Sequence, residues 1–431
     1  MKFKSLAAFG LVALMVIVVF TGLPAHASAQ PPTGVSNLGS VAVGVEPFFN
    51  DWNPTSGDFF VANYGSDSVS VISGTSHFVI KTITVGTNPE GVENVSQPGG
   101  IDQVWVTNYG SNSVSIINVS TLTVVATVPV GTNPSRLAYD YADGLVFVTN
   151  RGSSNVSAIS TTTDLVTATI ATTSNPIGAY VDDDTNEVFI TTYVGDEVQV
   201  CYGNNLTWLK NISLPGAGPA AITHDSVVHS VYVAGFTNGV IYTIGDHSRA
   251  VTTAITVPGN PYGLVYDPFD GFIFIGDASS DLITFVNPTN QTYAGDLPVG
   301  LYPYAVHGID LNNGVVLSSN YGSNNVTFIA GGTGGGGRRR WAAGSYFRLG
   351  ALRAARGDSP RGGGGLRLRR QAGIQRRPLM ASERVRASRR AKGYSRRAKR
   401  RTHKVARWTG HQVHKTDRTL TRWGRKVERD F

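Results

Sequence analysis

Short runs of apolar and β-branched residues, each bounded by turn-forming residues, recur along most of the chain. Between Pro134 and Pro176 the runs are RLAYD, LVFVTN, VSAIS and LVTATIA, and the segments YADG and RGSSN separate the first three. Runs rich in Val, Ile, Thr, Phe and Tyr between clusters of Gly, Asn, Asp and Pro are typical of β-strands. The pattern predicts a four-stranded antiparallel meander, and no window has the period of a long helix.

The meander is repeated seven times. One landmark is a proline, usually in GTNP or a related turn, and its copies are 42 to 45 residues apart: Pro47, Pro89, Pro134, Pro176, Pro219, Pro261 and Pro303. A second landmark, exemplified by FVAN, WVTN and FVTN, keeps the same spacing and ends at Asn63, Asn108, Asn150, Thr192, Gly235, Asp277 and Asn320. Units of 40 to 45 residues with four strands are typical of propeller blades. The sequence therefore predicts an all-β fold, a seven-bladed β-propeller of four-stranded antiparallel blades over residues 35–330.

The two ends of the repeat region complement each other. The last unit supplies only three strands, at Ala305 to Asp310, Val315 to Ser319 and Asn325 to Ala330, whereas an extra run, Val35 to Gly44, precedes the first proline. Pairing the N-terminal strand with the last blade removes exposed edges. We therefore expect an N-terminal strand to close the ring.

Three sequence stretches carry a family resemblance: FVANYGSDSVSVI, VWVTNYGSNSVSII and VVATVPVGTNP. They resemble the YVTN-type β-propeller repeat of exported and cell-surface proteins. The resemblance covers about residues 35 to 330, and blades four to six lose the Asn-Tyr-Gly corner. It implies a propeller at the cell exterior, with surface-layer, adhesion or scaffold contacts.

Both landmarks are expected on one face of the ring, around the mouth of the central channel. After the Asn position stand Tyr64, Tyr109, Arg151, Tyr193, Phe236, Ala278 and Tyr321; after the proline stand Phe48, Glu90, Ser135, Ile177, Ala220, Tyr262 and Tyr304, with Arg136 one residue further. Such a crown of aromatics suits protein, peptide or sugar contact, although rings repeated in most blades also serve to pack adjacent blades. Residues that differ between blades are the stronger binding candidates, namely Glu90, Arg136, Arg151, Tyr262 and Tyr304; Tyr64, Tyr109 and Tyr321 accompany them.

The repeat region contains no recognised catalytic or metal-binding sequence motif. His224 and His307 fall on predicted innermost strands and are candidates to face the channel, and the other histidines of the body are scattered over different blades. Asp182, Asp184 and Asn186 have calcium-loop spacing, but Glu187 and Tyr193 occupy positions that need Gly and Glu, so a solvated hairpin turn is expected. We expect no catalytic residue, no metal and no cofactor.

The two ends of the chain differ from the repeat region in composition. Residues 1–29 combine Lys2 and Lys4, an apolar run from Leu6 to Phe20 and small residues before Ala27 and Ala29, which predicts a cleaved export signal. Residues 331–431 are rich in Gly and Arg, with 30 Lys or Arg against 5 Asp or Glu, whereas residues 1–330 have 7 against 24. This segment is a disordered basic tail or the product of a frame change. If it is a true part of the chain, it is the only part suited to contact with an anionic membrane. We expect no specific nucleic-acid partner.

Two functions remain open at the level of sequence. The first is an exported, non-enzymatic propeller, secreted or at the cell surface, that presents a binding face to protein or glycan. The second is a propeller enzyme of the lactonase or streptogramin-lyase kind, which the repeats also resemble in fold, with residues such as His224, His307 or Glu90 at the channel. An enzyme needs two or more titratable groups converging on one pocket, so the arrangement of the channel separates the two.

Overall fold

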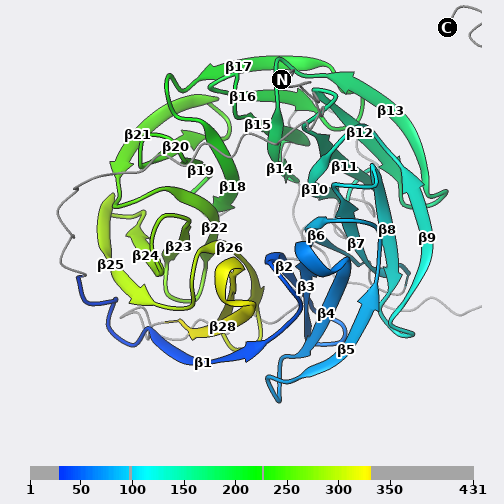
Figure 1. Cartoon of the computed structure of the whole chain (residues 1–431). Coiled ribbons are helices and arrows are strands. Elements are labelled where there is room, and N and C mark those ends of the chain that lie inside the picture. Colours follow the sequence, from blue (N-terminus) through cyan, green and yellow to red (C-terminus); the bar gives the residue numbers. More distant parts are fainter. Residues whose placement is uncertain (1–28, 97–99, 226–227, 332–431) are drawn as a thin grey trace, which may run out of the picture. The chain divides into compact units, whose positions relative to one another are not determined.

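The computed structural model describes residues 29–96, 100–225 and 228–331 of the 431-residue chain. In this part, 28 strands form seven four-stranded antiparallel sheets arranged around a central axis (Figure 1). The predicted seven-bladed β-propeller is confirmed. The predicted signal peptide and basic tail lie outside the described residues, apart from Ala29 and Gly331.

Each of the first six blades follows chain order from the channel outward. The strands of the first three blades are β2 (Pro47–Asn53), β3 (Asp58–Asn63), β4 (Ser68–Ser73), β5 (Val79–Thr84), β6 (Pro89–Ser96), β7 (Asp102–Asn108), β8 (Ser113–Asn118), β9 (Thr123–Pro129), β10 (Pro134–Asp140), β11 (Leu145–Asn150), β12 (Asn155–Ser160) and β13 (Leu165–Ala171). Those of the next three are β14 (Pro176–Asp182), β15 (Glu187–Thr192), β16 (Glu197–Tyr202), β17 (Trp208–Ser213), β18 (Pro219–Asp225), β19 (Ser230–Gly235), β20 (Val240–Gly245), β21 (Ala250–Thr256), β22 (Pro261–Asp267), β23 (Phe272–Asp277), β24 (Leu282–Asn287) and β25 (Thr292–Pro298).

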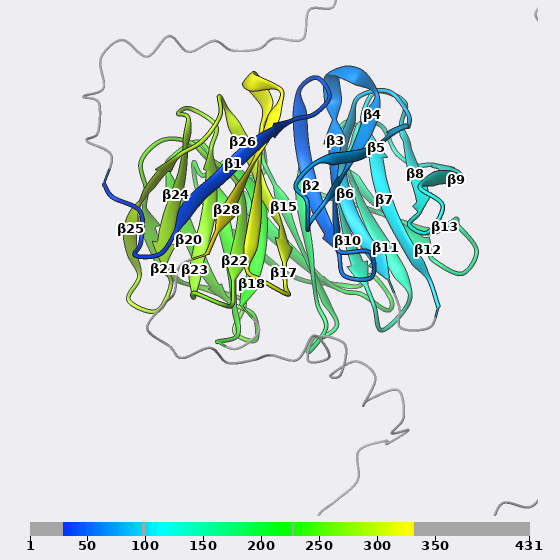
Figure 2. The same cartoon turned by 90° about the horizontal axis from the view of Figure 1, so that it is seen from below.

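The seventh blade joins the two ends of the repeat region. It contains β26 (Pro303–Asp310), β27 (Val315–Asn320) and β28 (Asn325–Ala330), and its outer strand is β1 (Ser36–Ala42) from the start of the described chain. β1 runs antiparallel to β28, from Ser36 opposite Ala330 to Ala42 opposite Asn325 (Figure 2). The predicted closure by an N-terminal strand is confirmed.

Apolar side chains of neighbouring blades share one core layer at each blade junction. Between blades one and two, for example, Phe60 and Val71 of the first pack with Val104 and Ile117 of the second, all essentially unexposed. A single blade cannot cover both of its apolar faces, so the ring is stable only when the blades stack. Within the described residues, no helix is long and apolar enough to cross a bilayer.

The inner strand of every blade is irregular just after its proline. In blades one to six the pairing with the second strand shifts over the two residues after the proline, as between Pro134 and Leu137. In blade three the Thr149 hydroxyl accepts a hydrogen bond from the Arg136 N–H (3.0 Å) and donates one to the Ile177 carbonyl of the next blade (2.7 Å). The bulge therefore presents the residues after the proline to the channel. The Thr before the landmark Asn joins adjacent blades through the hydrogen bond from its hydroxyl to the next blade.

The landmark Asn is a structural residue. Asn108 is fully buried; its side-chain oxygen accepts a hydrogen bond from the Gly86 N–H (3.0 Å), and its amide donates to Ser113 (3.1 Å) and Ser115 (3.0 Å). Asn63 makes the equivalent bonds in blade one. Each such Asn holds the turn before the proline against the second and third strands, which explains its recurrence without reference to a ligand.

Candidate binding face and channel

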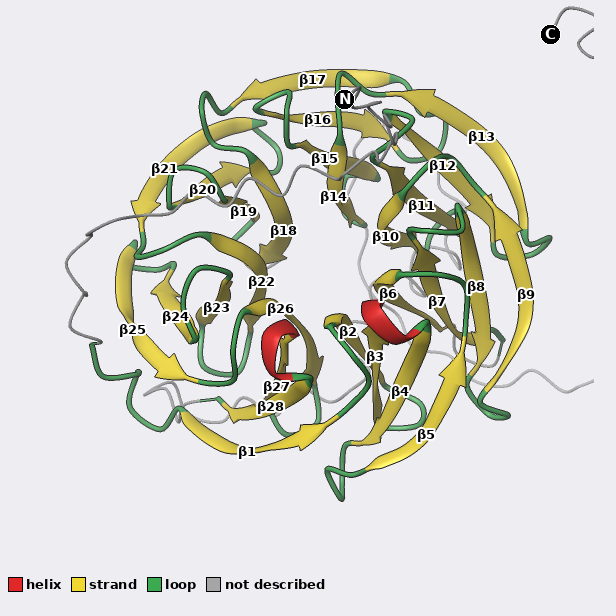
Figure 3. Cartoon of the chain, viewed as in Figure 1, coloured by secondary structure: helices red, strands yellow, loops and turns green. Residues whose placement is uncertain are grey.

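Aromatic side chains gather at one mouth of the channel. We call this group the aromatic face: Phe48, Tyr64, Tyr109, Tyr193, Phe236, Tyr262, Tyr304 and Tyr321. Phe48 is at its centre, stacked on Tyr304 with ring centroids 5.3 Å apart, and edge-on to Tyr262 and Tyr321 at 5.9 Å each. The single-turn 3₁₀ helices η1 (Tyr64–Ser66) and η2 (Tyr321–Ser323) begin at two of these tyrosines and lie next to the channel (Figure 3).

The residues of the aromatic face have both structural and surface roles. Tyr64 and Tyr109 donate their backbone N–H groups to the turns before Pro47 and Pro89, at Glu46 and Asn88 (2.9 Å each), which stabilises the corner. Their side chains are only half-buried. The backbone of these residues therefore stabilises the corners of the blades, while their rings keep part of their surface exposed at the channel mouth.

Charged residues predicted as binding candidates form a buried group beside the aromatics. Glu90 is almost unexposed; one of its oxygens accepts a hydrogen bond from the Ser135 hydroxyl (2.5 Å) and lies 3.9 Å from Nη1 of Arg151. Burial alone would lower the pKa of Arg151, but Glu90 and the tyrosines Tyr262 and Tyr109 raise it, and the net pKa is above the usual value. The pKa of Tyr262 is raised, first by burial and then by Glu90. The structure thus brings Glu90, Arg151 and Tyr262 together.

Arg136 occupies the channel beneath this group. Its guanidinium lies over the ring of Phe49, a cation–π contact, and its Nε is buried without a hydrogen-bond partner in the described chain. Burial lowers the pKa of Arg136 to about 9, although Tyr262, Glu90 and Glu93 oppose the shift. The Arg136 guanidinium and the Phe49 ring, both buried, therefore fill part of the channel near its mouth.

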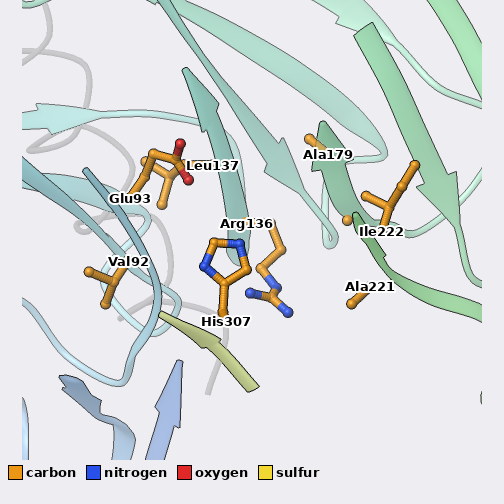
Figure 4. Close-up of a pocket in the computed structure, with 9 residues that line it drawn as sticks. Val92, Glu93, Arg136, Leu137, Ala179, Ala221, Ile222 and His307 are labelled. Atoms are coloured by element: carbon orange, nitrogen blue, oxygen red, sulfur yellow. The ribbon is translucent and has the colours of Figure 1, made fainter. Parts of the chain in front are cut away.

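A small pocket lies further along the channel. Arg136 and His307 line it with Glu93 and the apolar side chains Val92, Leu137, Ala179, Ala221 and Ile222 (Figure 4). Nδ1 of His307 is 3.7 Å from an Asp51 oxygen and has no hydrogen-bond partner within the described residues. Desolvation, followed by the nearby Asp51, raises the pKa of Glu93 well above its usual value. Three titratable groups thus share a pocket that has room for about one water molecule.

Not every predicted candidate faces the channel. His307 lines the pocket, whereas the His224 imidazole is 3% exposed and is turned toward Tyr180 and Asp246 at the junction of blades four and five. Asp51 and Glu93 were missed. The available signal was that they are charged residues in the middle of inner strands, where the other blades mostly have apolar or uncharged side chains.

The calcium-like spacing at 182–186 forms a hairpin turn, as the sequence indicates. One Asp182 oxygen accepts a hydrogen bond from the Asp184 N–H (3.0 Å), and the other accepts one from the Thr185 hydroxyl (2.6 Å). Burial, with Asp140, Asp182 and Asp184 nearby, raises the pKa of Asp183 to about 6. Both oxygens of Asp182 are therefore occupied by the turn.

The turns before the first and last landmark prolines break the repeat at the edge of the aromatic face. Blades two and three read GTNP, but blade one reads GVEP and blade seven reads GLYP. Val45, Leu301 and Tyr302 are 46%, 48% and 51% exposed. The two turns contact the same corner, because Asn324 after η2 accepts a hydrogen bond from the Glu46 N–H (2.8 Å), while Tyr302 accepts one from the Tyr321 N–H (3.0 Å). We call Val45, Glu46, Leu301, Tyr302 and Tyr321 the seven-one patch; sequence reasoning missed its first four members.

Comparison with known proteins finds a similar fold. A hydrazine synthase chain of Kuenenia stuttgartiensis superimposes with a TM-score of 0.60 and 19% identity, over 68% of this chain and 97% of that chain. At that identity the similarity shows the fold and does not transfer chemistry. No protein-family model matches the sequence, and no curated protein matches it. The described residues form a seven-bladed β-propeller, and membership of the YVTN-type repeat family stays a prediction.

Proposed function

We propose that this chain is an exported, non-enzymatic propeller that binds a protein or glycan at the cell surface through its aromatic face. The observation that carries the proposal is the seven-one patch, where two blades replace the repeated turn with exposed apolar and aromatic residues. The patch includes the tyrosines Tyr302 and Tyr321, and tyrosine is one of the residues most enriched among the anchors of binding interfaces. A patch that differs from the repeat supports a specific role better than rings shared by most blades.

The departure from the repeat costs stability, which argues for a selected function. The residue before the proline has positive φ in blades one to five and seven, for example 55° at Glu46, 50° at Asn88, 52° at Asn133 and 51° at Tyr302. Asn tolerates this conformation, and Asn88 and Asn133 also donate hydrogen bonds to carbonyls of the preceding blade (3.0 and 3.2 Å). A bulky residue there costs about 1 kcal/mol or more. Residues that oppose local preference concentrate at functional sites.

The chemistry of the patch favours a protein over a sugar. Val45 and Leu301 offer only aliphatic surface to a partner, whereas sugar hydroxyls need hydrogen-bond donors and acceptors. Tyr302 and Tyr321 add aromatic rings with polar tips, which are frequent at protein interfaces. A glycan ligand is therefore the second choice for this face.

The test is a double substitution that gives blade seven the same turn sequence as blades two and three. Leu301→Thr combined with Tyr302→Asn restores GTNP, and we expect a melting temperature equal to or above that of the parent because the strained residue is removed. Binding to a cell-envelope fraction of the source organism, measured by biolayer interferometry, should weaken at least tenfold. Trp208→Ser, which removes an exposed ring from outer strand β17, is the matched control and should bind like the parent.

The outcomes separate the alternatives. Equal binding by the restored-turn variant and the parent would contradict a role for the patch. Protease treatment of the envelope should abolish binding if the partner is a protein, whereas periodate treatment should abolish it if the partner is a glycan.

The enzyme hypothesis rests on the channel pocket, where Glu93, Arg136 and His307 converge. A carboxyl group with a raised pKa beside a histidine is typical of acid–base sites. The restricted volume and the side chains filling the mouth support binding outside the channel rather than a reaction within it. Hydrolysis of a lactone panel that is lost in Glu93→Gln would favour the enzyme.

Residues 1–29 support export, because they combine lysines with an apolar run, as export signals do. Of the two predicted cleavage positions, cleavage after Ala27 would retain Ala29, whose carbonyl accepts a hydrogen bond from the Asp296 N–H (3.1 Å). The mature N-terminal peptide, sequenced by mass spectrometry from the native host, should begin at Ser28; a chain that begins at Met1 would contradict export.

A further inference from the structure

Three histidines surround one buried carboxylate at the far end of blade five from the aromatic face. The carboxylate belongs to Asp246, which directly follows β20 and is 1% exposed. One of its oxygens is 3.1 Å from Nε2 of His224 and 3.2 Å from Nδ1 of His229. The other is 3.1 Å from Nδ1 of His247. Residues that are 22 apart in sequence thus meet in one cluster.

Two of the imidazoles are open to solvent and one is not. His229 and His247 are 49% and 60% exposed, and their ring centroids are 4.8 Å apart. One ring nitrogen of each histidine and an Asp246 oxygen all lie within 4.8 Å of one another. An ion could therefore reach these three atoms from solution without opening the fold.

His224 holds the carboxylate from behind. Its second ring nitrogen, Nδ1, is 2.8 Å from the Tyr180 hydroxyl of blade four, so both ring nitrogens are engaged. The buried carboxylate of Asp182, whose oxygens accept hydrogen bonds within its own turn, lies near His224 and Asp246 and adds negative charge there. Outer hydrogen bonds that fix a ligand and added negative charge are features of metal sites in proteins.

The other blades provide an internal comparison. In blade five the Asp246 N–H donates to the His229 carbonyl (3.2 Å), and the same bond joins Gly74 to Gly57, Val119 to Asp102, Thr161 to Gly144, Gly203 to Asn186 and Gly331 to Gly314. These hydrogen bonds identify equivalent positions. In the five other blades with this bond, Gly, Val or Thr is paired with Gly, Asp or Asn, whereas blade five has Asp paired with His.

His229 also occupies a position that disfavours it. Its φ is +53°, in the left-handed region that Gly57, Gly144 and Gly314 occupy in their blades. A histidine there costs about 1 kcal/mol relative to glycine. The hairpin turn does not require this side chain, so the repeat gives no structural reason for it.

The donor set and spacing suit a transition metal. With bonds of about 2.0–2.2 Å, tetrahedral ligand atoms are roughly 3.3 Å apart. Nδ1 of His229 is 3.2 Å from one Asp246 oxygen and Nδ1 of His247 is 3.1 Å from the other, so each histidine nitrogen is already at about this distance from one oxygen of the carboxylate. Imidazole nitrogen favours Zn²⁺ and its neighbours over Ca²⁺ or Mg²⁺, which prefer all-oxygen shells.

We propose that His229, His247 and Asp246 bind a divalent transition-metal ion such as Zn²⁺, with His224 positioning the carboxylate. Three protein ligands leave a fourth position for water or another group. The proposal replaces the expectation of no metal, which rested on the scattering of histidines along the sequence. It is independent of the aromatic face, which lies at the other end of the blades.

The experiment is isothermal titration of the full-length, untagged protein with ZnCl₂. We expect one ion that is bound by the parent and lost, or weakened at least a hundredfold, in His229→Gly/His247→Ala. The double variant should fold at least as well as the parent, because four other blades have glycine at the position of His229, namely Gly57, Gly144, Gly271 and Gly314. Thermal melting without metal checks this point.

Further variants keep the result interpretable. Replacing the tail histidines His403, His411 and His414 with Gln removes three imidazoles elsewhere and should leave the blade-five affinity unchanged. Titration with CaCl₂ should give no binding at this site. Zinc binding of equal affinity in the parent and the double variant would overturn the proposal, as would loss of the tight site in the tail variant alone.

Discussion

Asp267 at the end of β22 carries a charge that the fold disfavours. The residue is fully buried; one oxygen accepts a hydrogen bond from the Phe269 N–H (2.8 Å), and the other has no hydrogen-bond partner within the described residues. Burial, followed by the nearby Asp270, raises its pKa to about 8. Asn53 is at the same place in blade one, where its side-chain oxygen accepts hydrogen bonds from two turn N–H groups, of Thr55 and Ser56. Asp267→Asn should therefore keep the turn and remove the charge.

The size and sign of the effect follow from linkage. Because the folded state holds the proton at higher pH than the unfolded state, the stability of the parent falls as pH rises from about 4 to about 8. A pKa of about 8 instead of 3.8 corresponds to roughly 4 kcal/mol at pH 7, at about 1.4 kcal/mol per unit. Because the Asn side chain still loses its hydration when it is buried, we expect Asp267→Asn to stabilise the fold by a smaller amount, about 1–3 kcal/mol at pH 8. The gain should vanish near pH 4.

The assay is urea unfolding of parent and variant at several pH values between 4 and 8, followed by circular dichroism. Asp58→Asn is the matched control, because Asp58 is less buried and its pKa is raised less. A stabilisation of equal size at pH 4 and pH 8 would show that the charge is not the cause. Destabilisation by Asp267→Asn at pH 8 would refute the reasoning.

Two further predictions concern the ring itself. Thr149→Val leaves the buried Arg136 N–H without its acceptor and should lower the free energy of unfolding by about 2–3 kcal/mol, measured by urea titration. The control, Thr162→Val at an exposed position, should change the free energy of unfolding by less than about 0.5 kcal/mol. Equal effects of the two substitutions would contradict the inter-blade role of Thr149. Deleting residues 30–43 removes β1 and exposes the edge of β28, so the melting temperature should fall and size-exclusion chromatography should show self-association. Unchanged melting would mean that closure by β1 contributes little.

Sequence periodicity predicted the fold because each blade repeats the same physical requirements. The Asn that ends the second strand in four blades and the Pro that begins every inner strand recur because the turn geometry needs them, so the spacing of these landmarks is enough to count the blades. The lack of a fourth strand after Ala330 likewise predicted the pairing of β1 with β28. Boundaries in the last blade differ by at most two residues from those expected.

The site residues were less predictable because their neighbours are distant in sequence. Glu90 and Arg151 were expected on one face, but their pairing depends on the rotation between blades two and three. The orientation of His224 away from the channel pocket depends on which face of β18 packs against Tyr180. His229 and Asp246 meet because a hairpin joins β18 to β19, and β20 returns beside them. Aligning the blades position by position would have identified two departures from the repeat, namely the turns of the seven-one patch and the Asp–His pair of blade five.

The central claim is that the seven-one patch is where a partner binds, and site-specific photo-crosslinking tests it most directly. A benzophenone amino acid is placed at Tyr302 in one protein and at Trp208, on the rim of blade four, in another, and each is irradiated with the cell envelope of the source organism. The account predicts one dominant crosslinked species from position 302 and none from position 208. Crosslinking of the same partner from position 208, or none from position 302 under saturating binding, would contradict it.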